Sequence, residues 1–567
     1  MRNKEIAEIF EEIADLYEMK GVDFKPRAYR NAAQSIRSLG EDISEIRERG
    51  ELDDIPGVGK SSVKKIEEFL DTGKVSRLDE LKKDIPVDIE KITGVESLGP
   101  KKVLKLYQEI GIKSLDDLKE AAKKGKIAEV EGFGERTQKK ILENIAFAEL
   151  KGERFLLGFV LPQSDDIVDR LEDLSKRIEV AGSLRRSRET VGDIDILVVA
   201  KDRGKIMERF TSMDEVKDVI QSGKKKSSVK LHGGIQVDLR AVDDKSFGSA
   251  LMYFTGSKQH NVHLRKIAQK ENWKLNEYGV FQGEKRLAGK TEEEVFSKLG
   301  LDWIPPEMRE DQGEIELASK GDLPKLVERG DIRSDLQMHS TWSDGNNSVL
   351  EMAEACRDLG HDYMAITDHG GEITIANGLD LDSIRKQKEE IEEAREKAGI
   401  GILHGLEANI QKDGKLDIGK KEKEEVDLVL GAIHSAFRMD RNDMTERLVT
   451  ALGSGDFHIL AHPTARMLQE RKGINVDMDK VFEAAADAGT IMEINAYPKR
   501  LDLGGYHVKR AIEAGVKISI GTDSHRSDHL RYIDLGVATA RRGWATKDDI
   551  VNTLSLDEFK KLISRIG

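Results

Sequence analysis

The 567-residue sequence has a single cysteine, Cys356, and no apolar run that approaches the roughly 18 residues needed to cross a bilayer. One cysteine excludes an internal disulfide and suits a reducing compartment. The first residues are charged and contain no apolar targeting segment. We therefore expect a cytoplasmic protein without membrane segments that acts as a monomer.

Aromatic residues are also scarce, at 5%, whereas charged residues make up 35% of the chain. The net charge of −14 does not exclude nucleic-acid binding, because local patches steer binding and residues 219–237 carry four lysines and no acid. The length predicts three or more domains. Only three of the 13 histidines precede residue 330, which indicates a change of domain there and metal chemistry in the C-terminal part.

Three segments of the N-terminal third, residues 55–60, 95–100 and 130–135, place glycine directly before a basic amphipathic stretch. Glycine lets the backbone turn sharply, and the helix that follows offers free N–H groups and a positive dipole end to a phosphate. Three copies favour a region that follows a sugar–phosphate backbone, although ordinary helical hairpins with glycine turns would show the same pattern. The residues expected to contact DNA are Gly57, Gly59, Lys60, Gly99, Lys101, Gly132 and Gly134.

Residues 193–199 alternate in the manner of a strand, with Asp193 and Asp195 on one face and apolar residues on the other. A second strand, 235–240, repeats the alternation and places Asp238 on its polar face. Carboxylates this close together are tolerated beside cations, so the pattern predicts a site for Mg²⁺ or Mn²⁺ that suits nucleotidyl transfer, with a solvated acidic turn as the alternative. Donors for phosphate oxygens precede or adjoin the acids, namely Ser183, Arg186 and Gly192.

The three glycine turns resemble helix–hairpin–helix motifs, and the first of them, with residues 24–33, resembles the small lyase domain of family X DNA polymerases. Alignment on residues 56–59 implies that Lys65 is the amine that forms a Schiff base with an abasic sugar, with Lys25 and Tyr29 near the bound 5′-phosphate. A neighbouring lysine, Lys64, favours loss of a proton from Lys65. The alternative is that Lys65 only contacts a phosphate.

Residues 253–278 resemble the thumb of the same family in order and spacing, although an aromatic pair alone would indicate a core. With this segment the resemblance covers residues 1 to about 310, and it implies a DNA-directed DNA polymerase that uses dNTPs on gapped or primer–template DNA. The implied contacts are Tyr253, Phe254 and Gly256 with the incoming sugar, Asn261 with the base, and Arg265 with the template side.

Beyond residue 333, short apolar strands alternate with charged helical stretches, as expected for a barrel-like α/β sheet. Polar residues repeatedly close these strands, and the loops at strand C-terminal ends are where barrel enzymes hold their chemistry. A single histidine at such a place is usually structural, but the repetition predicts a metal cluster. The predicted ligands are His339, Asp344, His369, Glu407, His434, His462, Asp523 and His525.

These ligands resemble the motifs of the polymerase and histidinol phosphatase (PHP) superfamily over about residues 333–567. Mixed histidine and carboxylate ligands suit Zn²⁺ or Mn²⁺, and clustered metals activate hydroxide and clamp a phosphodiester. Attached to a polymerase, such a domain implies a 3′-to-5′ exonuclease that also removes blocked 3′ ends. Gln337 departs from the pattern, because it stands where the superfamily commonly has histidine, and glutamine is a weak neutral ligand.

The predicted fold is multidomain: an α-helical helix–hairpin–helix N-terminal region, an α/β nucleotidyltransferase palm with an α+β thumb, and an α/β barrel-like PHP domain. The expected boundaries are 1–85 for the lyase-like domain, 86–150 for a second DNA-binding region, 151–245 for the palm, 246–315 for the thumb, 316–332 for a linker and 333–567 for the PHP domain. The expected function is gap-filling DNA synthesis in repair with trimming of the 3′ end.

Three alternatives remain open at this point. The first is a polymerase whose barrel is catalytically impaired and structural, and Gln337 favours it. The second is a DNA end-binding module with a scaffold barrel, against which the intact Asp193 and Asp195 speak. The third is a small-molecule phosphatase fused to an RNA-directed nucleotidyltransferase, against which the three glycine turns and the thumb segment speak.

Overall fold

The structure, a computed structural model, describes residues 2–22, 24–37, 43–87, 100–130, 132–134, 154–371 and 377–566, with the single residues 92, 98, 138 and 141. The chain divides into two compact units, one of residues 1–154 with 311–315 and the other of residues 155–310 with 316–567. Among the described helices there is none that combines the length and the hydropathy needed to span a membrane.

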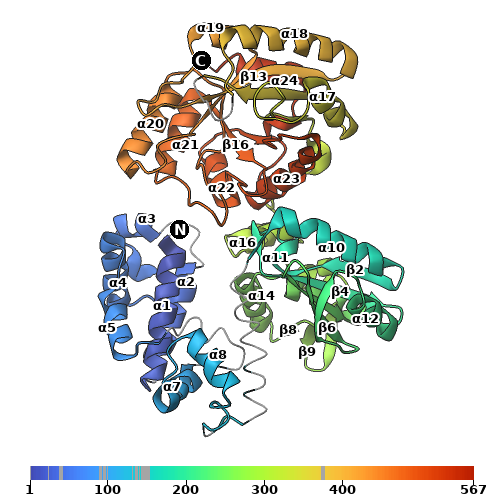
Figure 1. Ribbon diagram of the computed structural model, residues 1–567. Coiled ribbons are helices and arrows are strands. Elements are labelled where there is room, and N and C mark those ends of the chain that lie inside the picture. The colour runs from blue at the N-terminus through green and yellow to red at the C-terminus, as the bar shows by residue number, and fades with distance from the viewer. Residues whose placement is uncertain are drawn as a thin grey trace. The chain divides into compact units, whose positions relative to one another are not determined.

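The first unit is helical and is built around one apolar core (Figure 1). Helix α1 (Arg2–Met19) buries Ile6, Phe10, Ile13 and Tyr17, whose spacing places them on one face, and α2 (Lys25–Arg37) packs against α1. The other described helices are α3 (Ile43–Glu48), α4 (Lys60–Thr72), α5 (Ser76–Asp84), α7 (Pro100–Ile110) and α8 (Leu115–Lys123).

In the second unit, the region predicted as the palm is a five-stranded sheet in the order β2-β4-β7-β6-β5. The two central strands, β4 (Asp193–Ala200) and β7 (Gln236–Ala241), run parallel, and the other pairs are antiparallel. Ile194, Ile196 and Val198 pack into a core with α10 and α12, so the alternate residues of β4 face the other way. The remaining elements are β1 (Phe155–Leu156), α10 (Leu157–Glu172), β2 (Ser175–Val180), α11 (Gly182–Arg185), β3 (Thr190–Val191), α12 (Arg203–Thr211), β5 (Val216–Gln221) and β6 (Lys226–Leu231).

The region predicted as the thumb packs on that opposite face of the sheet. Leu197 and Val199 of β4 lie in one core with Phe247 and Leu251 of α13 (Phe247–Thr255). Further along lie α14 (Lys258–Lys270), a three-stranded antiparallel sheet of β8 (Lys274–Asn276), β9 (Gly279–Gln282) and β10 (Lys285–Ala288), then α15 (Glu292–Lys298) and α16 (Glu314–Lys320).

The C-terminal part contains seven parallel strands in chain order, which confirms the predicted α/β barrel. The barrel nearly closes, because the segments that follow the first and last strands meet: the His339 N–H donates to the Ser524 carbonyl at 2.8 Å, and the Asp523 N–H donates to the Gln337 carbonyl at 3.0 Å. The strands are β11 (Ser334–Asp335), β12 (Tyr363–His369), β13 (Gly401–Asn409), β14 (Leu428–Ala432), β15 (Ile459–Leu460), β16 (Ile491–Asn495) and β17 (Ile518–Gly521).

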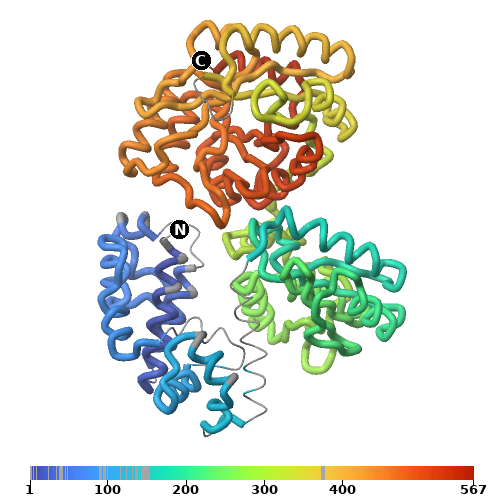
Figure 2. The backbone as a smooth tube through the Cα atoms, viewed as in Figure 1, coloured from blue at the N-terminus to red at the C-terminus, as the bar shows by residue number. Residues whose placement is uncertain are grey.

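Helices surround these strands, as Figures 1 and 2 show in yellow to red. Met364 and Ile402 pack in one core with residues of α17 and α18, whereas Tyr363 and Leu403 lie in another core with Phe559 of α24. The helices are α17 (Val349–Asp358), α18 (Leu381–Ala398), α19 (Lys420–Glu424), α20 (Arg441–Gly453), α21 (Met478–Ala488), α22 (Gly505–Glu513), α23 (Ile533–Arg542) and α24 (Leu556–Ile563).

Part of the segment expected to be a linker belongs to the barrel. Val327 and Ile332 are buried in the barrel core, and the Val327 N–H donates to the Ala545 carbonyl at 2.9 Å. The charged and glycine-rich composition of residues 317–332 conceals these few apolar anchors.

Candidate active sites

The eight predicted barrel ligands meet at one end of the barrel because parallel strands end at the same edge of the sheet. His369 closes β12, Glu407 lies near the end of β13, and the two are register partners. His369 is six residues after Tyr363, and Glu407 is four residues after Leu403. Because side chains alternate along a strand, each lies on the same inward face as that apolar residue. His434, His462, Asp523 and His525 each follow a strand within a few residues, and His339 and Asp344 follow β11.

Glu407 is the centre of the first cluster and is 1% exposed. Its carboxylate lies 2.9 Å from His462 Nε2, 3.2 Å from His434 Nε2 and 3.3 Å from His369 Nδ1. His339 Nε2 lies 3.6 Å from it. Burial alone would raise the pKa of Glu407, but His434 and His369 hold this pKa well below its usual range, so the carboxylate is charged.

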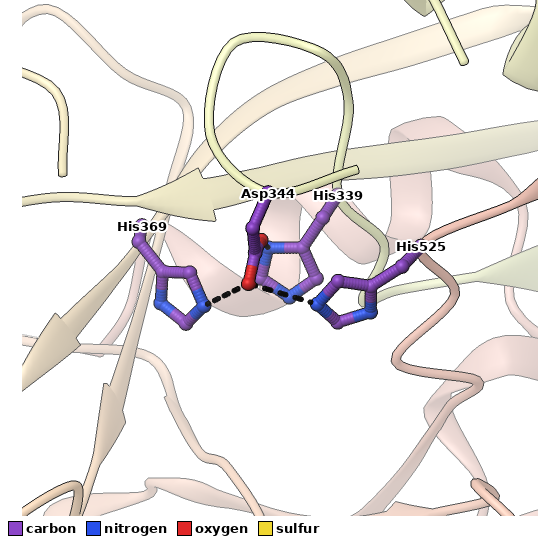
Figure 3. A group of neighbouring side chains, drawn as sticks. All are labelled: His339, Asp344, His369 and His525. Carbon is purple, nitrogen blue, oxygen red and sulfur yellow. Dashed lines mark ion pairs between the residues drawn. The ribbon is translucent and has the colours of Figure 1, made fainter. Parts of the chain in front are cut away.

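Asp344 is the centre of the second cluster, which Figure 3 shows with three histidines around one carboxylate. Its oxygens lie 3.3 Å from His525 Nε2, 3.7 Å from His369 Nε2 and 3.8 Å from His339 Nδ1. His339 Nε2 also lies 3.2 Å from Asp523 Oδ1. His339 and His369 therefore face both clusters, which makes the site one continuous group of ligands.

The donor set fits metal ions. Buried ring nitrogens of His339, His369, His434 and His462 have no hydrogen-bond partner, and such atoms are costly unless something binds them. Burial lowers the pKa of His369 to about 4, so its ring is neutral at pH 7 and has a lone pair for a metal. Three or four ligand atoms converge in each of two groups with mutual distances within 4.8 Å. This arrangement suits borderline metals such as Zn²⁺ or Mn²⁺.

Gln337 lies at the edge of this cluster and is buried. Its amide nitrogen, when it faces the carboxylate of Glu493, lies within hydrogen-bond distance of that carboxylate. Glu493 also accepts from the His462 N–H at 2.7 Å, and Asn495 donates to Asp523 at 3.0 Å. Neither residue was among the predicted ligands. Asn495 ends an apolar strand, which is the same signal that marked His369 and Glu407.

Arg500 is a third residue that the sequence did not single out. Its Nε lies 3.4 Å from Asp523 Oδ2, and its side chain is 21% exposed. It stands in the irregular segment between β16 and α22, where no periodicity places a side chain. Arg500 gives the acidic and histidine-rich pocket a fixed cation that is only partly buried.

The palm aspartates are adjacent because β4 and β7 are parallel and in register. Asp195 is the direct partner of Asp238, and Asp193 is the partner of Gln236. Burial raises the pKa of Asp195 to about 7, and repulsion from Asp193 and Asp238 adds to this. Three carboxylates that resist joint ionisation fit divalent metal ions, which would remove the repulsion.

Two cations lie beside the palm aspartates. Asp238 pairs with Lys226 Nζ at 2.7 Å and Arg240 Nη2 at 3.1 Å, and it accepts from Gln236 at 2.7 Å. Burial alone would raise the pKa of Asp238, but Lys226 and its other partners lower this pKa below its usual value. Lys226 belongs to the basic run of residues 219–237, so the sequence showed its charge but not its partner.

The predicted phosphate donors stand on segments that adjoin Asp195 in the chain or in the sheet. The Ala181 N–H donates to the Asp195 carbonyl at 2.8 Å, and a Cβ on Gly182, where φ is +66°, would lie 2.9 Å from Asp195 Oδ2. This close approach explains the glycine before Ser183, which lies in the single-turn helix α11. Arg186 ends α11, and Gly192 immediately precedes β4.

The structure also brings the predicted thumb residues together. Asn261 of α14 is 8% exposed and donates to the Tyr253 carbonyl at 2.7 Å. Tyr253 and Phe254 end α13 with their rings 5.2 Å apart, and Gly256 follows at φ +74°. Phe254 also stacks under Arg240 at 4.6 Å, which connects it to the palm aspartates. Arg265 lies one turn after Asn261 on the same helix and is partly exposed.

In the first unit, the predicted lyase residues gather around a stacked pair of tyrosines. Lys65 Nζ lies 5.7 Å from the centre of the Tyr29 ring, and Lys25 Nζ lies 4.7 Å from that of Tyr17. The two tyrosine rings stack at 5.8 Å. Arg77 Nε donates to the Tyr17 hydroxyl at 2.9 Å, so Tyr17 and Arg77 are neighbours of this site that the sequence did not indicate.

The first glycine turn has the geometry expected of it. Gly57 has φ +82°, and Gly59 precedes α4, which begins at Lys60. In the second copy α7 begins at Pro100, and Lys101 is exposed, but Gly99 lies outside the described residues. In the third copy Gly132 has φ +86° and Gly134 is exposed, while most of the helix predicted at 136–150 lies outside the described residues.

Comparison with known families matches four segments of the chain. Residues 1–75 match a helix–hairpin–helix domain, and 88–146 match a SAM-like helix–hairpin–helix tandem. Residues 250–310 match the DNA polymerase beta thumb, and 335–497 match the PHP domain. These matches define a polymerase of the helix–hairpin–helix type that is joined to a PHP domain.

Relatives extend the similarity to the whole chain. DNA polymerase/3′-5′ exonuclease PolX of Bacillus subtilis (strain 168) is 38% identical over 573 residues, 100% of both chains. DNA polymerase lambda of Arabidopsis thaliana is 27% identical over 54% of this chain and 62% of its own, and that of Rattus norvegicus is 25% identical over 54% and 56%. The chain belongs to the family X DNA polymerases with a C-terminal PHP domain, which confirms the resemblance noted in the sequence.

Proposed function

We propose that the chain fills short gaps in DNA during repair and trims the 3′ end at a separate site in its barrel. The register pairing of Asp195 with Asp238 carries the polymerase half of this proposal, because it joins carboxylates from two strands into one site. The full-length relative from Bacillus subtilis is named as both a DNA polymerase and a 3′-5′ exonuclease. This chain likewise contains a polymerase thumb followed by a PHP domain.

In the palm, Asp193, Asp195 and Asp238 would hold two Mg²⁺ or Mn²⁺ ions, which supply activation of the primer hydroxyl and charge neutralisation on the triphosphate. The protein residues supply position. Ser183 in α11, Arg186 directly after α11 and the Gly192 backbone directly before β4 would be the donors for phosphate oxygens. Tyr253, Phe254 and Gly256 hold the sugar, Asn261 and Arg265 lie on the adjoining helix toward base and template, and Asp238 is placed to accept the primer proton.

In the barrel, the eight ligands around Glu407 and Asp344 would hold Zn²⁺ or Mn²⁺, which supplies hydroxide for attack on a phosphodiester. Arg500 is the one cation that pairs with this group among the described contacts, and it is partly exposed. We assign it to the substrate phosphate, since a guanidinium binds phosphate oxygens in pairs. Asn495 and Glu493 orient Asp523 and the His462 backbone from behind.

A labelled primer on one-nucleotide-gapped duplex DNA tests both halves in one assay. With Mn²⁺ and dNTPs, the chain is expected to extend the primer; with Mn²⁺ alone, it is expected to shorten it stepwise. EDTA is expected to stop both reactions, because both sites depend on ions. Extension without any shortening would leave the polymerase assignment intact and overturn the exonuclease assignment.

Gln337 favours a second candidate for the barrel, in which catalysis is impaired and the domain is structural. In the structure the Gln337 side chain faces Glu493 and Asn495, and it contacts neither Glu407 nor Asp344 among the described interactions. The eight predicted ligands still converge, however, and neither group of candidate metal ligands includes Gln337. We therefore favour a working nuclease.

Lys65 is proposed as the Schiff-base lysine of a 5′-deoxyribose phosphate lyase, supported by its position over Tyr29 and near Lys25. Its Nζ donates to the Ser61 carbonyl and hydroxyl at 2.9 Å, which fixes the amine. Borohydride trapping on a 5′-incised abasic substrate is expected to cross-link the wild type to DNA. The yield of cross-linked protein is expected to fall by about 100-fold in Lys65→Ala. Lys74→Ala removes an exposed lysine just beyond the same helix; it is the control and is expected to cross-link normally. Trapping that persists in Lys65→Ala would refute this role.

The DNA partner follows from the helix–hairpin–helix families matched by residues 1–75 and 88–146. We propose that Gly57, Gly59 and Lys60 bind the backbone of gapped DNA, since α4 begins directly after this glycine turn and a helix N-terminus favours a phosphate. Lys101, Gly132 and Gly134 would do the same in the second region. The chain would act on DNA and dNTPs as a monomer.

A further inference from the structure

Arg542 is a barrel residue whose side chain reaches the palm. It ends α23, and its side chain is 12% exposed. Its Nη1 donates to the main-chain carbonyl of Arg186 at 2.6 Å and lies 3.2 Å from Glu310 Oε1. The barrel holds it closely, because a Cβ on Gly505 of α22 would lie 2.7 Å from Arg542 Cβ. One end of Arg542 is thus fixed in the PHP domain and the other touches the turn after α11.

Glu310 joins Arg542 to the side chain of Arg186. Arg186 Nε lies 3.2 Å from the same Glu310 oxygen, and Arg188 lies 3.4 Å from it. Burial alone would raise the pKa of Glu310, but Arg542, Arg186 and Arg188 lower it to about 2. Glu310 is therefore charged, and it is 16% exposed with three guanidinium groups around a single oxygen.

Arg186 is held from the thumb side as well. Its Nη1 donates to the Thr255 carbonyl, at the end of α13 and beside Gly256. The Arg186 carbonyl is the C-cap acceptor of the four-residue helix α11, where a cation is favourable. Palm, thumb and barrel thus meet at the one arginine expected to bind the triphosphate.

We propose that Arg542 is a positioning residue for nucleotide binding: it fixes the backbone and, through Glu310, the guanidinium of Arg186. The PHP domain would then contribute to the polymerase reaction without touching substrate. This inference rests on the proposed role of Arg186 as a phosphate donor. Its consequence is that affinity for dNTP, not the rate of the chemical step, depends on a barrel side chain.

The adjacent residue offers a matched control. Arg541 is also on α23 and also reaches across to the thumb side, where its Nε lies 2.7 Å from Glu307. It donates to the Val327 carbonyl at 3.0 Å, and none of its described contacts involves Arg186. A change at Arg541 therefore removes the same charge from the same helix without removing a contact to Arg186 in the turn after α11.

Steady-state extension of a gapped primer at varied dNTP tests the proposal. Arg542→Ala is expected to raise KM for dNTP about tenfold while kcat changes by less than about twofold. Arg542→Lys is expected to recover part of the loss, because it restores a positive charge that can pair with Glu310, while its shorter side chain does not place the nitrogen where Nη1 makes both contacts. Arg541→Ala is expected to leave KM within about twofold of the wild type.

A double-mutant cycle separates this inference from the proposed function. If Arg186→Ala leaves KM unchanged, the proposed role of Arg186 fails. If Arg186→Ala raises KM and adding Arg542→Ala raises it no further, Arg542 acts through Arg186 as proposed. Additive effects of the two substitutions on KM, or an equal rise of KM in Arg541→Ala, would overturn the inference. Either result would show that Arg542 acts through the general packing of the domains and not through Arg186.

Two further measurements keep the test decisive if Arg542→Ala is poorly folded. Glu310→Gln, which keeps the side-chain shape and removes the charge, is expected to raise KM in the same direction. Primer shortening in Mn²⁺ without nucleotides is expected to be unchanged in Arg542→Ala, because Arg542 is not among the barrel ligands. A normal KM in Glu310→Gln would contradict the proposed route.

Discussion

Replacing Asp238 with asparagine is expected to abolish nucleotide incorporation. The change keeps the size of the side chain but removes the carboxylate that pairs in register with Asp195, and it leaves Lys226 and Arg240 without their anion. Loss of metal-dependent stabilisation worth several kcal/mol would lower kcat by about 10³-fold or more. Primer extension under single-turnover conditions measures this directly.

Asp218→Asn is the control for this variant. Asp218 stands in β5, the edge strand of the same sheet, and is exposed, so the substitution makes the same chemical change away from the aspartates. It is expected to extend primers at the wild-type rate. Primer shortening should persist in Asp238→Asn, since the barrel ligands are untouched. If Asp238→Asn incorporated nucleotides at a rate within about tenfold of the wild type, the assignment of Asp238 to the catalytic site would be wrong.

Replacing Glu407 with glutamine is expected to abolish primer shortening. Glu407 is nearly fully buried and lies within 3.6 Å of ring nitrogens of His339, His369, His434 and His462. A neutral amide would leave the bound ions without their central anion, and we expect shortening to fall by about 10³-fold with weaker metal binding. Radiolabelled or fluorescent 3′-end assays in Mn²⁺, with metal content measured on the purified protein, give both readouts.

Glu425→Gln provides the matched control in the same domain. Glu425 pairs with Arg385 and Lys388 at 3.0 and 3.2 Å on the outer surface, so its loss removes one charge and two surface ion pairs but no ligand. Wild-type shortening is expected. If Glu407→Gln lost metal but still shortened primers, the nuclease would lie elsewhere; if both variants failed, the loss would reflect stability and not the site.

These expectations describe two sites that can be inactivated separately. The one coupling that we propose between them runs through the contacts of Arg542, which acts on nucleotide affinity. The exonuclease and polymerase variants should therefore complement each other in a mixed assay on gapped DNA, while Arg542→Ala should impair only the polymerase at low dNTP.

Much of both sites could be predicted from the sequence because their ligands follow simple periodicities. Asp193 and Asp195 show a two-residue alternation, and the barrel ligands stand at the ends of apolar strands, where a parallel sheet must bring them together. The short apolar strands expected beyond residue 333 are present as β11 to β17. Such local patterns predict the structure correctly because burial of the apolar face of a strand fixes its register and therefore which residues face the site.

Other features have no local signature. Lys226 pairs with Asp238 across neighbouring strands, and Arg77 reaches Tyr17 from a helix 60 residues away. Glu493 stands in the middle of an apolar strand, and only its contact with the His462 N–H shows that it belongs to the site. The packing of Val327 and Ile332 into the barrel was hidden in a charged segment.

The sequence by itself determined the domain order, the alternation that puts aspartates on one face, and the strand ends that carry the barrel ligands, because these depend on neighbours a few residues apart. Only the tertiary structure decided that β4 lies in register with β7, that Gln337 faces Glu493, and that Arg542 holds Arg186 across 356 residues. The physical reason is that long-range contacts depend on how whole domains pack, and a charged side chain gives no sign in sequence of which distant partner will neutralise it.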